Sequence, residues 1–158
     1  MSIDPALLRR ALRHVPTSVA VVTSVTDTGR PVGMTVGSFA SASLAPPLVS
    51  FFAGCASATW PLIHATGRFC VNVLAAHQGD LGAAFAGSRA DRFAGLTWSP
   101  GPLGSPVLDG VLAWLECELD STYRVGDHHA VIGRVSSLEA REDVGPLVFH
   151  RGALAALG

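Results

Sequence analysis

The 158-residue sequence predicts a mainly β protein with small helices, arranged as a closed or nearly closed antiparallel barrel. About seven runs rich in β-branched and aromatic residues are separated by turn residues. These runs follow one another in hairpin order, with small helices at the start and between some strands, which differs from the regular β-α-β alternation of a doubly wound parallel sheet. Barrel closure would also remove exposed strand edges. The length fits one domain over residues 1–158.

The first elements are a helix and a hairpin. Asp4 and Pro5 are typical of a helix start, and apolar residues at helical spacing then predict a helix over 5–14. From Thr17 the pattern changes to β-branched residues, which predicts a strand over 17–26. A turn at 27–30 leads into a return strand over 31–39.

The middle of the chain alternates strands with short helices. Pro46 and Pro47 precede a strand over 48–53. A short helix over 57–66 is expected to end at Gly67. A strand over 69–74 and a helix over 77–86 follow.

The last third holds the longest strand. Residues 88–110 are rich in Gly and Pro and predict a loop, and a long strand then covers 111–125. In that strand Glu116, Glu118 and Asp120 alternate with apolar residues, which predicts one solvent-facing side. The Gly126-Asp127-His128 turn leads to an antiparallel strand over 130–138 and a closing strand over 146–150.

Composition excludes several classes of protein. Hydrophobic residues make up 49% and charged residues 15%, the formal net charge is −1, and all 11 basic residues are arginine. No basic run points to nucleic acid, and no apolar run approaches a membrane span or a signal peptide. The odd cysteine count favours reduced thiols and a cytoplasmic protein. The low charge favours burial against another subunit.

Familiar nucleotide and metal motifs are missing. Neither the G-x-G-x-x-G fingerprint nor the Walker phosphate loop occurs. His128 and His129 adjoin each other, but neighbours on an extended segment point to opposite faces, so no metal site is expected.

Three segments remain as candidate binding sites, each with a structural alternative. Residues 35–43 are dense in hydroxyls and small side chains, and form either a phosphate-binding nest or a polar loop. Residues 52–59 form either a cradle for a flat ring at a helix start or a plain connection. His128 is either a donor to a substrate or an exposed turn residue.

Taken in order, these segments resemble the flavin reductase-like family over nearly the whole chain. The resemblance rests on V-P-T-S-V-A-V-V-T, G-M-T-V-G-S-F-A-S-A-S-L-A-P-P-L-V, S-A-T-W-P-L-I, F-C-V-N-V-L, D-R-F, L-A-W-L-E-C and G-D-H. It implies an FMN-binding split β-barrel, a homodimer, and NAD(P)H-dependent reduction of FMN or FAD. Such reductases supply reduced flavin to a separate oxygenase component.

The resemblance also implies roles for individual residues. The nicotinamide side would hold His128 as the orienting residue, with Ser41 beside it. The residues implied for the flavin side are Thr35, Val36, Gly37, Ser38, Phe52, Ala53, Gly54, Cys55, Ser57, Ala58, Phe85, Arg92 and Arg151.

Two other functions remain open at this point. A flavin-binding electron carrier on the same fold would lack the reductase activity. A hydrolase using Cys55 as nucleophile would need an activating histidine that the sequence does not identify.

Overall fold

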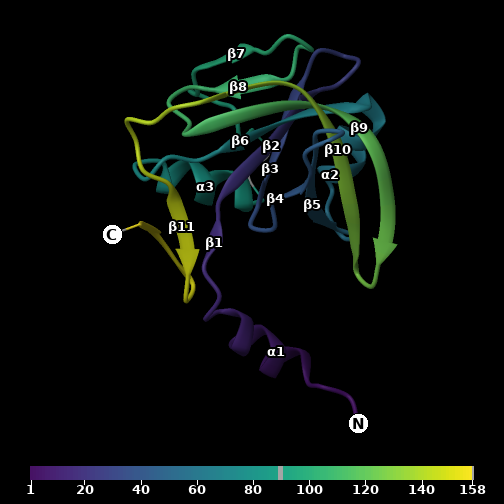
Figure 1. The fold of residues 1–158 in the computed structure, drawn as a ribbon, viewed down its shortest axis with the longest axis vertical. Coiled ribbons are helices and arrows are strands. Elements are labelled where there is room, and N and C mark those ends of the chain that lie inside the picture. The colour runs from purple at the N-terminus through teal and green to yellow at the C-terminus, as the bar shows by residue number, and fades with distance from the viewer. Residues whose placement is uncertain (89–90, 158) are drawn as a thin grey trace.

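The computed structural model describes residues 1–88 and 91–157, and shows a mainly β fold with three short helices (Figure 1). The helices are α1 (Pro5–Leu12), α2 (Trp60–Thr66) and α3 (Gly79–Ala86). The strands are β1 (Thr17–Ser18), β2 (Ala20–Val25), β3 (Pro31–Val36), β4 (Ala40–Ser43), β5 (Leu48–Gly54), β6 (Arg68–Val73), β7 (Trp98–Pro100), β8 (Pro106–Leu108), β9 (Ala113–Val125), β10 (His128–Ala140), β11 (Leu147–His150) and β12 (Ala153–Ala156).

One antiparallel sheet of seven strands forms the body, in the order β3-β2-β6-β9-β10-β5-β4. Its two end strands, β3 and β4, are consecutive in the chain and are joined only by residues 37–39. Since Val36 and Ala40 are four residues apart, about 14 Å at most, the sheet must curl until its ends approach each other. No ladder closes it within the described residues, so of the closed or nearly closed barrel expected from the sequence, full closure is not observed.

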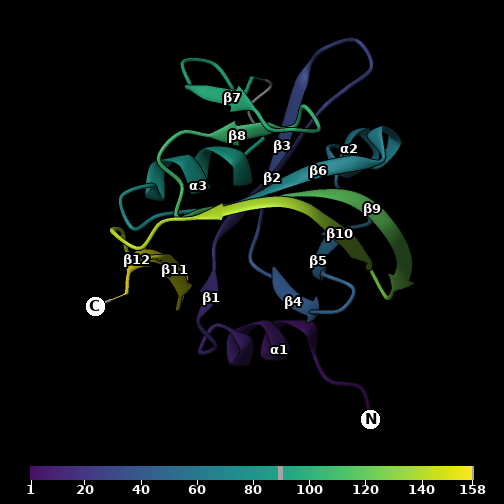
Figure 2. The same cartoon turned by 45° about the horizontal axis from the view of Figure 1, so that its top comes forward.

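Two smaller sheets flank the main one: β1-β11-β12 and the hairpin β7-β8. Figure 2 shows α3 on the same side of the molecule as the β11-β12 hairpin, with α1 at the opposite end from β7 and β8. None of the helices in residues 1–88 and 91–157 is long and apolar enough to cross a membrane.

Two apolar clusters hold these layers together. The curled sheet and α2 enclose the first, where Phe51 packs edge-on against Trp60 and Phe69 at centroid distances of 5.7 and 5.3 Å. The second lies between the sheet and α3 and includes Phe85 and Leu147. Together they fix the β5 end and the α3 side of the sheet, where most predicted site residues lie.

The local predictions for the first helix and the turns are confirmed. Asp4 caps α1 by accepting from the Ala6 amide at 2.9 Å, although the helix ends at Leu12, two residues earlier than expected. Gly67 ends α2 in the left-handed region at φ 69°. The Gly126-Asp127 turn joins β9 to β10, with Gly126 at φ 58°.

Several predicted boundaries are wrong. The strand expected over 17–26 is divided into β1 and β2, which belong to different sheets. The stretch 88–110 contains the β7-β8 hairpin, although its residues 89–90 lie outside the described part. The strands β4 and β12 were not predicted.

The solvent-facing side predicted for the longest strand is also wrong at one position. Glu116 is fully buried, whereas Glu118 and Asp120 are exposed. The backbone of the loop after β7 covers Glu116, because the amides of Leu103 and Ser105 donate to its carboxylate at 2.8 and 2.9 Å. The alternation of charge along a strand cannot reveal a loop that folds over it.

Candidate functional site

The end of β5 and the β9-β10 turn lie side by side, which joins two of the three predicted segments. Gly54 pairs with His128 in the β5-β10 ladder, and the Cys55 amide donates to the Asp127 carbonyl at 2.9 Å. A Cβ built on Gly54 would lie 4.0 Å from His128 Nε2. The histidine ring therefore stands beside a backbone that carries no side chain.

The turn itself orients His128. Its Nδ1 lies 2.7 Å from Asp127 Oδ1, and this hydrogen bond lowers the pKa of the Asp127 carboxyl below its ordinary value. The His128 side chain is 47% exposed and the Asp127 side chain 96%. With Nδ1 engaged by the carboxylate, Nε2 is the ring nitrogen free to meet a ligand.

The segment after β3 adjoins the same strand from its other side. The Phe52 amide donates to Ser38 Oγ at 2.9 Å, which ties residues 37–39 to β5. Ser41 lies opposite Val49 in the β4-β5 ladder and is exposed. Ser38 therefore lies near the end of β5, whereas Ser41 lies near the start of that strand.

The connection from β5 to α2 is built from small residues. Ala53 is fully buried, and Cys55 and Ala58 are exposed. Ser57 Oγ accepts from the Thr59 and Trp60 amides at 3.2 and 3.1 Å. Ser57 therefore binds two amides just before α2, whose N-cap residue is Thr59.

Arg92 joins three elements beside this connection. It donates to the Gly33 carbonyl at 2.8 Å and to Thr59 Oγ1 at 3.4 Å, and it also bonds the Gly87 carbonyl. Its Nε is buried and has no partner in the described part of the chain.

A cavity of about 790 Å³ opens at Arg92, here called the Arg92 cavity. Its lining residues are Arg30, Pro31, Val32, Gly33, Ala58, Thr59, Leu62, Ser88, Asp91, Arg92 and Phe93. Among the donors, Arg30 and Ser88 were missed by the sequence analysis, whereas Thr59 belongs to the predicted 52–59 segment. Arg30 follows the turn glycine Gly29, and in the sequence it looks like an ordinary turn residue. Only the structure, which places it in the same cavity as Arg92, identifies it as a candidate binding residue.

Thr35, Val36 and Gly37 border a second cavity of about 690 Å³, between β3, the end of α3 and the β11-β12 hairpin. Thr35 Oγ1 donates to the Gly82 carbonyl at 2.8 Å, and Val36 is buried. The Thr35 hydroxyl hydrogen is therefore used in a hydrogen bond within the fold. Gly37 is the most exposed of the three residues.

Two of the predicted site residues do not lie with the others at the surface: Phe85 is buried, and Arg151 lies in the β11-β12 turn. Phe85 is only 1% exposed and packs beneath Gly33, where an added Cβ would lie 2.8 Å from its ring. It therefore supports β3 from within. Arg151 forms the β11-β12 turn at φ 52°, next to Gly152 of the second cavity, and exchanges backbone and side-chain bonds with Arg13.

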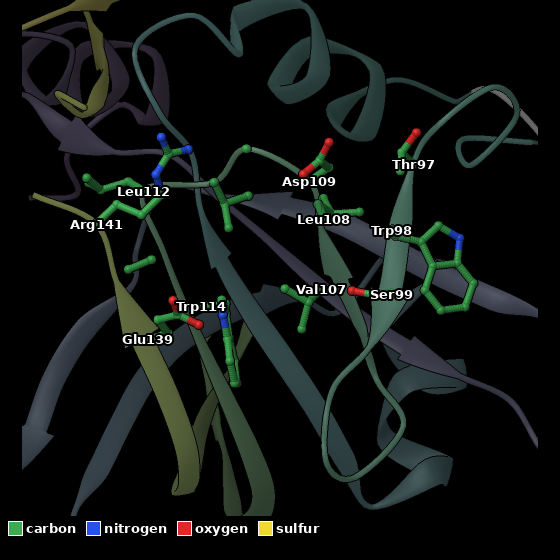
Figure 3. A pocket seen from close by; sticks show the side chains of 13 residues that line it. Thr97, Trp98, Ser99, Val107, Leu108, Asp109, Leu112, Trp114, Glu139 and Arg141 are labelled. Carbon is green, nitrogen blue, oxygen red and sulfur yellow. The ribbon is translucent and has the colours of Figure 1, made fainter. Parts of the chain in front are cut away.

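A third cavity contains none of the predicted site residues. It measures about 330 Å³ and is bordered by the β7-β8 hairpin and by Trp114, Glu139 and Arg141 of the main sheet and its end (Figure 3). Arg141 already forms a two-pronged ion pair with Asp143 at 2.7 and 3.0 Å. The candidate site therefore lies at β3, β5 and the β9-β10 turn.

Comparison with known proteins identifies the family of this chain. The flavin reductase like domain matches residues 12–158. The chain is 45% identical over 151 residues to the reductase subunit HsaB of a flavin-dependent monooxygenase from Rhodococcus jostii, covering 96% of this chain and 77% of that protein.

Two solved structures share the fold closely. Nitrilotriacetate monooxygenase component B from Mycobacterium thermoresistibile superposes with a TM-score of 0.94 at 40% identity, covering 98% and 87% of the two chains. The NADH:FAD oxidoreductase SgcE6 from Streptomyces globisporus, in complex with NAD and FAD fragments, gives 0.92 at 33% identity, covering 100% and 97%. This chain belongs to the flavin reductase-like domain family.

Proposed function

We propose that this chain is an NAD(P)H:flavin oxidoreductase that reduces FMN or FAD and supplies the reduced flavin to a separate oxygenase component. The observation that carries the proposal is the meeting of Ser38, Gly54 and His128 at one end of β5. A reductase subunit and a monooxygenase component among its relatives support the same role.

The Arg92 cavity fits the anionic part of a flavin nucleotide. Arg30 and Arg92 supply positive charge, and Thr59 and Ser88 supply hydroxyls. The Arg92 Nε, buried and without a partner in the described residues, is a donor that the fold leaves unused. Guanidinium groups bind phosphates through charge-assisted hydrogen bonds, so this donor set suits a phosphate.

The adjoining β5 end fits the flat ring. Gly54 leaves a surface that a Cβ would fill, and the exposed Cys55 and Ala58 are small. Ring contacts are therefore assigned to Phe52, Gly54, Cys55, Ser57 and Ala58, and the fully buried Ala53 supports them from beneath. Thr35, Val36, Gly37 and Ser38 are assigned to the flavin side next to the ring, and Arg151 adjoins Gly152 of the second cavity.

When bound, a flavin supplies the two-electron redox chemistry, and the protein positions the reactants. His128 orients the nicotinamide through Nε2, because Asp127 holds Nδ1. Ser41 is assigned to the nicotinamide side from the resemblance alone, since it lies opposite Val49 near the start of β5. Hydride transfer needs no general base, so His128 is a binding residue and not an acid–base catalyst.

Three further properties belong to the same proposal. The curled sheet whose ends are joined by residues 37–39 is assigned as a split barrel within one domain over 1–158. The exposed apolar residues Phe52, Tyr123 and Val125 favour a homodimer. The free thiols of Cys55, Cys70 and Cys117 favour a cytoplasmic setting.

The flavin should exchange freely. No lysine occurs in the chain, and most contacts assigned to flavin are neutral. Each neutral hydrogen bond contributes about 0.5–1.5 kcal/mol, so a handful supports roughly micromolar binding. Such exchange suits a reductase that passes flavin to another protein.

Steady-state oxidation of NADH and NADPH with FMN, FAD and riboflavin tests the activity. We expect flavin-dependent oxidation above the buffer rate with at least one pair of substrates. Absence of oxidation with all pairs overturns the proposal. Protein that stays fully yellow through repeated gel filtration in flavin-free buffer would favour the electron carrier.

The Cys55 hydrolase has less support. Within the described residues the Cys55 thiol forms no hydrogen bond with an imidazole, the contact that would activate it. Iodoacetamide labelling of Cys55 followed by the oxidation assay separates the two functions. Nicotinamide oxidation that persists after labelling excludes Cys55 as a nucleophile in that reaction.

A further inference from the structure

The Arg92 cavity adjoins another space at the β2-β3 turn. This neighbouring space, here called the Arg68 cavity, measures about 430 Å³ and is bordered by that turn, the end of α2 and the start of β6. Arg30 and Leu62 line both cavities, so the two spaces meet along these side chains. A ligand held at Arg92 therefore has room to continue past Arg30.

Two arginines give the Arg68 cavity a positive charge. Arg30 and Arg68 are both exposed, and within residues 1–88 and 91–157 their hydrogen bonds involve only backbone atoms. No carboxylate in this described part forms an ion pair with either guanidinium, although Glu118 lies opposite Arg68 in the β6-β9 ladder. Both guanidinium groups are therefore available to an anion.

The backbone beneath both arginines is fixed. The Arg30 carbonyl accepts from the Thr26 amide at 2.9 Å, and the Arg30 amide donates to Thr26 Oγ1 at 3.2 Å. The Arg68 carbonyl accepts from Ser24 Oγ at 2.9 Å, and the Arg68 amide donates to Thr66 Oγ1 at 3.3 Å. Since only the side chains remain to be ordered, anion binding here costs less entropy than it would on an unanchored loop.

The rest of the lining suits a nucleoside. Leu62 and Ala65 lie three residues apart on α2, and both are exposed, so they form a small apolar surface against which a flat base packs. Asp27 brings an exposed carboxylate from the turn, and carboxylates accept hydrogen bonds from ribose hydroxyls. The cavity thus combines cations for a phosphate with an apolar wall and an acceptor for a nucleoside.

We infer that the Arg68 cavity binds the adenosine monophosphate half of FAD, and that this chain binds FAD in preference to FMN. The inference rests on the proposed function and names which of the two flavins the site fits. FMN carries one phosphate, which the Arg92 cavity accommodates, and it leaves Arg68 without an anion. FAD carries a second phosphate and an adenosine. Because Arg30 lines both cavities, it borders both phosphates of FAD.

Calorimetric titration of the full chain with FAD and with FMN measures the two dissociation constants. We expect FAD to bind roughly tenfold more tightly than FMN. Arg68→Gln should raise the FAD constant about 5–10-fold, because solvent partly screens an exposed charge, and should leave the FMN constant within about twofold. Arg10→Gln removes the same charge from an exposed position on α1 outside both cavities, and should change neither constant.

A second variant and a fragment of the ligand give independent tests. Ala65→Glu places a carboxylate on the exposed face of α2 and should weaken FAD binding without affecting FMN. Adenosine monophosphate is the half of FAD that FMN lacks. It should therefore compete with FAD, bind alongside FMN, and bind more weakly to the Arg68→Gln variant.

The outcomes separate this inference from the proposed function. FAD that binds no more tightly than FMN, equal losses of both flavins in the variants, or adenosine monophosphate that displaces FMN overturns the inference. A KM for NADH that rises in Arg68→Gln with FMN as acceptor assigns the cavity to the nicotinamide nucleotide and also overturns it. A chain that binds FAD as expected but oxidises no nicotinamide overturns the reductase function alone. Circular dichroism checks that the variants stay folded.

Discussion

The buried carboxylate of Glu116 should be one of the most sensitive positions for stability. It lies near the start of β9 with no exposed surface, and its two oxygens accept from the amides of Ser105 and Leu103 at 2.9 and 2.8 Å. Gly101 lies so close that an added Cβ would be 2.4 Å from Oε2. The carboxylate therefore holds the loop between β7 and β8 against the main sheet.

The expected cost follows from these two bonds. A hydrogen bond to a charged group contributes about 1.5–3 kcal/mol. Glu116→Gln keeps one carbonyl acceptor but turns an NH₂ group toward a backbone amide, so we expect a loss of about 2–4 kcal/mol. Glu116→Ala leaves both amides without a partner and opens a cavity, which should cost about 3–5 kcal/mol. Against a typical total of about 5–15 kcal/mol, either loss is large.

Urea unfolding of the full chain measures these differences. Glu118→Gln is the matched control, because Glu118 lies two residues along β9 and is exposed. We expect the control to differ from wild type by less than about 0.5 kcal/mol. If Glu116→Gln is no less stable than the control, the amide contacts do not hold the loop and the reasoning is wrong.

Three other changes probe the core, the site and the thiols. Gly133→Ala places a Cβ 2.5 Å from a phenylalanine ring atom and should cost about 1–3 kcal/mol in urea unfolding, whereas Gly79→Ala meets open space and should cost nothing. His128→Ala should lower kcat/KM for the nicotinamide roughly 5–30-fold while flavin titration gives an unchanged affinity; equal loss of both would contradict its role. Iodoacetamide at pH 8 should label Cys55 in the folded protein, while burial raises the pKa of the Cys117 thiol to about 12 and protects it until unfolding; mass spectrometry of native and denatured samples decides.

Elements whose signals are local could be predicted from the sequence. Asp4 and Pro5 define the start of α1, and Gly67 defines the end of α2, because each acts on its own helix terminus. The Gly126-Asp127 turn is local in the same way. It has a positive φ at its first residue and connects two strands of 13 residues.

Elements that depend on distant partners could not be predicted. The strands β4, β7, β8 and β12 have only three or four residues each, too few to show a periodic pattern. Their pairing is set by neighbours in space. Glu116 is the clearest case, since its burial depends on loop amides from another part of the chain.

In the candidate site, too, some features could be predicted from local sequence and others depend on contacts between distant parts of the chain. Short motifs identified Ser38, Gly54 and His128 one by one, but their adjacency follows from the order of strands in the sheet. Arg30 was missed because beside a turn glycine it has no distinguishing pattern. Phe85 was named from its place in the chain, and only packing shows that it supports β3 from beneath.

The position of the site at the two ends of the sheet has a physical reason. A strand at the end of a sheet has backbone groups that no neighbouring strand satisfies. At β3 the Gly33 carbonyl accepts from Arg92, and the loop beyond β3 bonds β5 through Ser38. Side chains thus replace the missing strand and leave open space beside it. Because Arg92 is already fixed by these bonds, it loses little rotamer freedom when an anion binds. The open end of the sheet therefore provides both the room for a nucleotide and a pre-oriented cation to hold it.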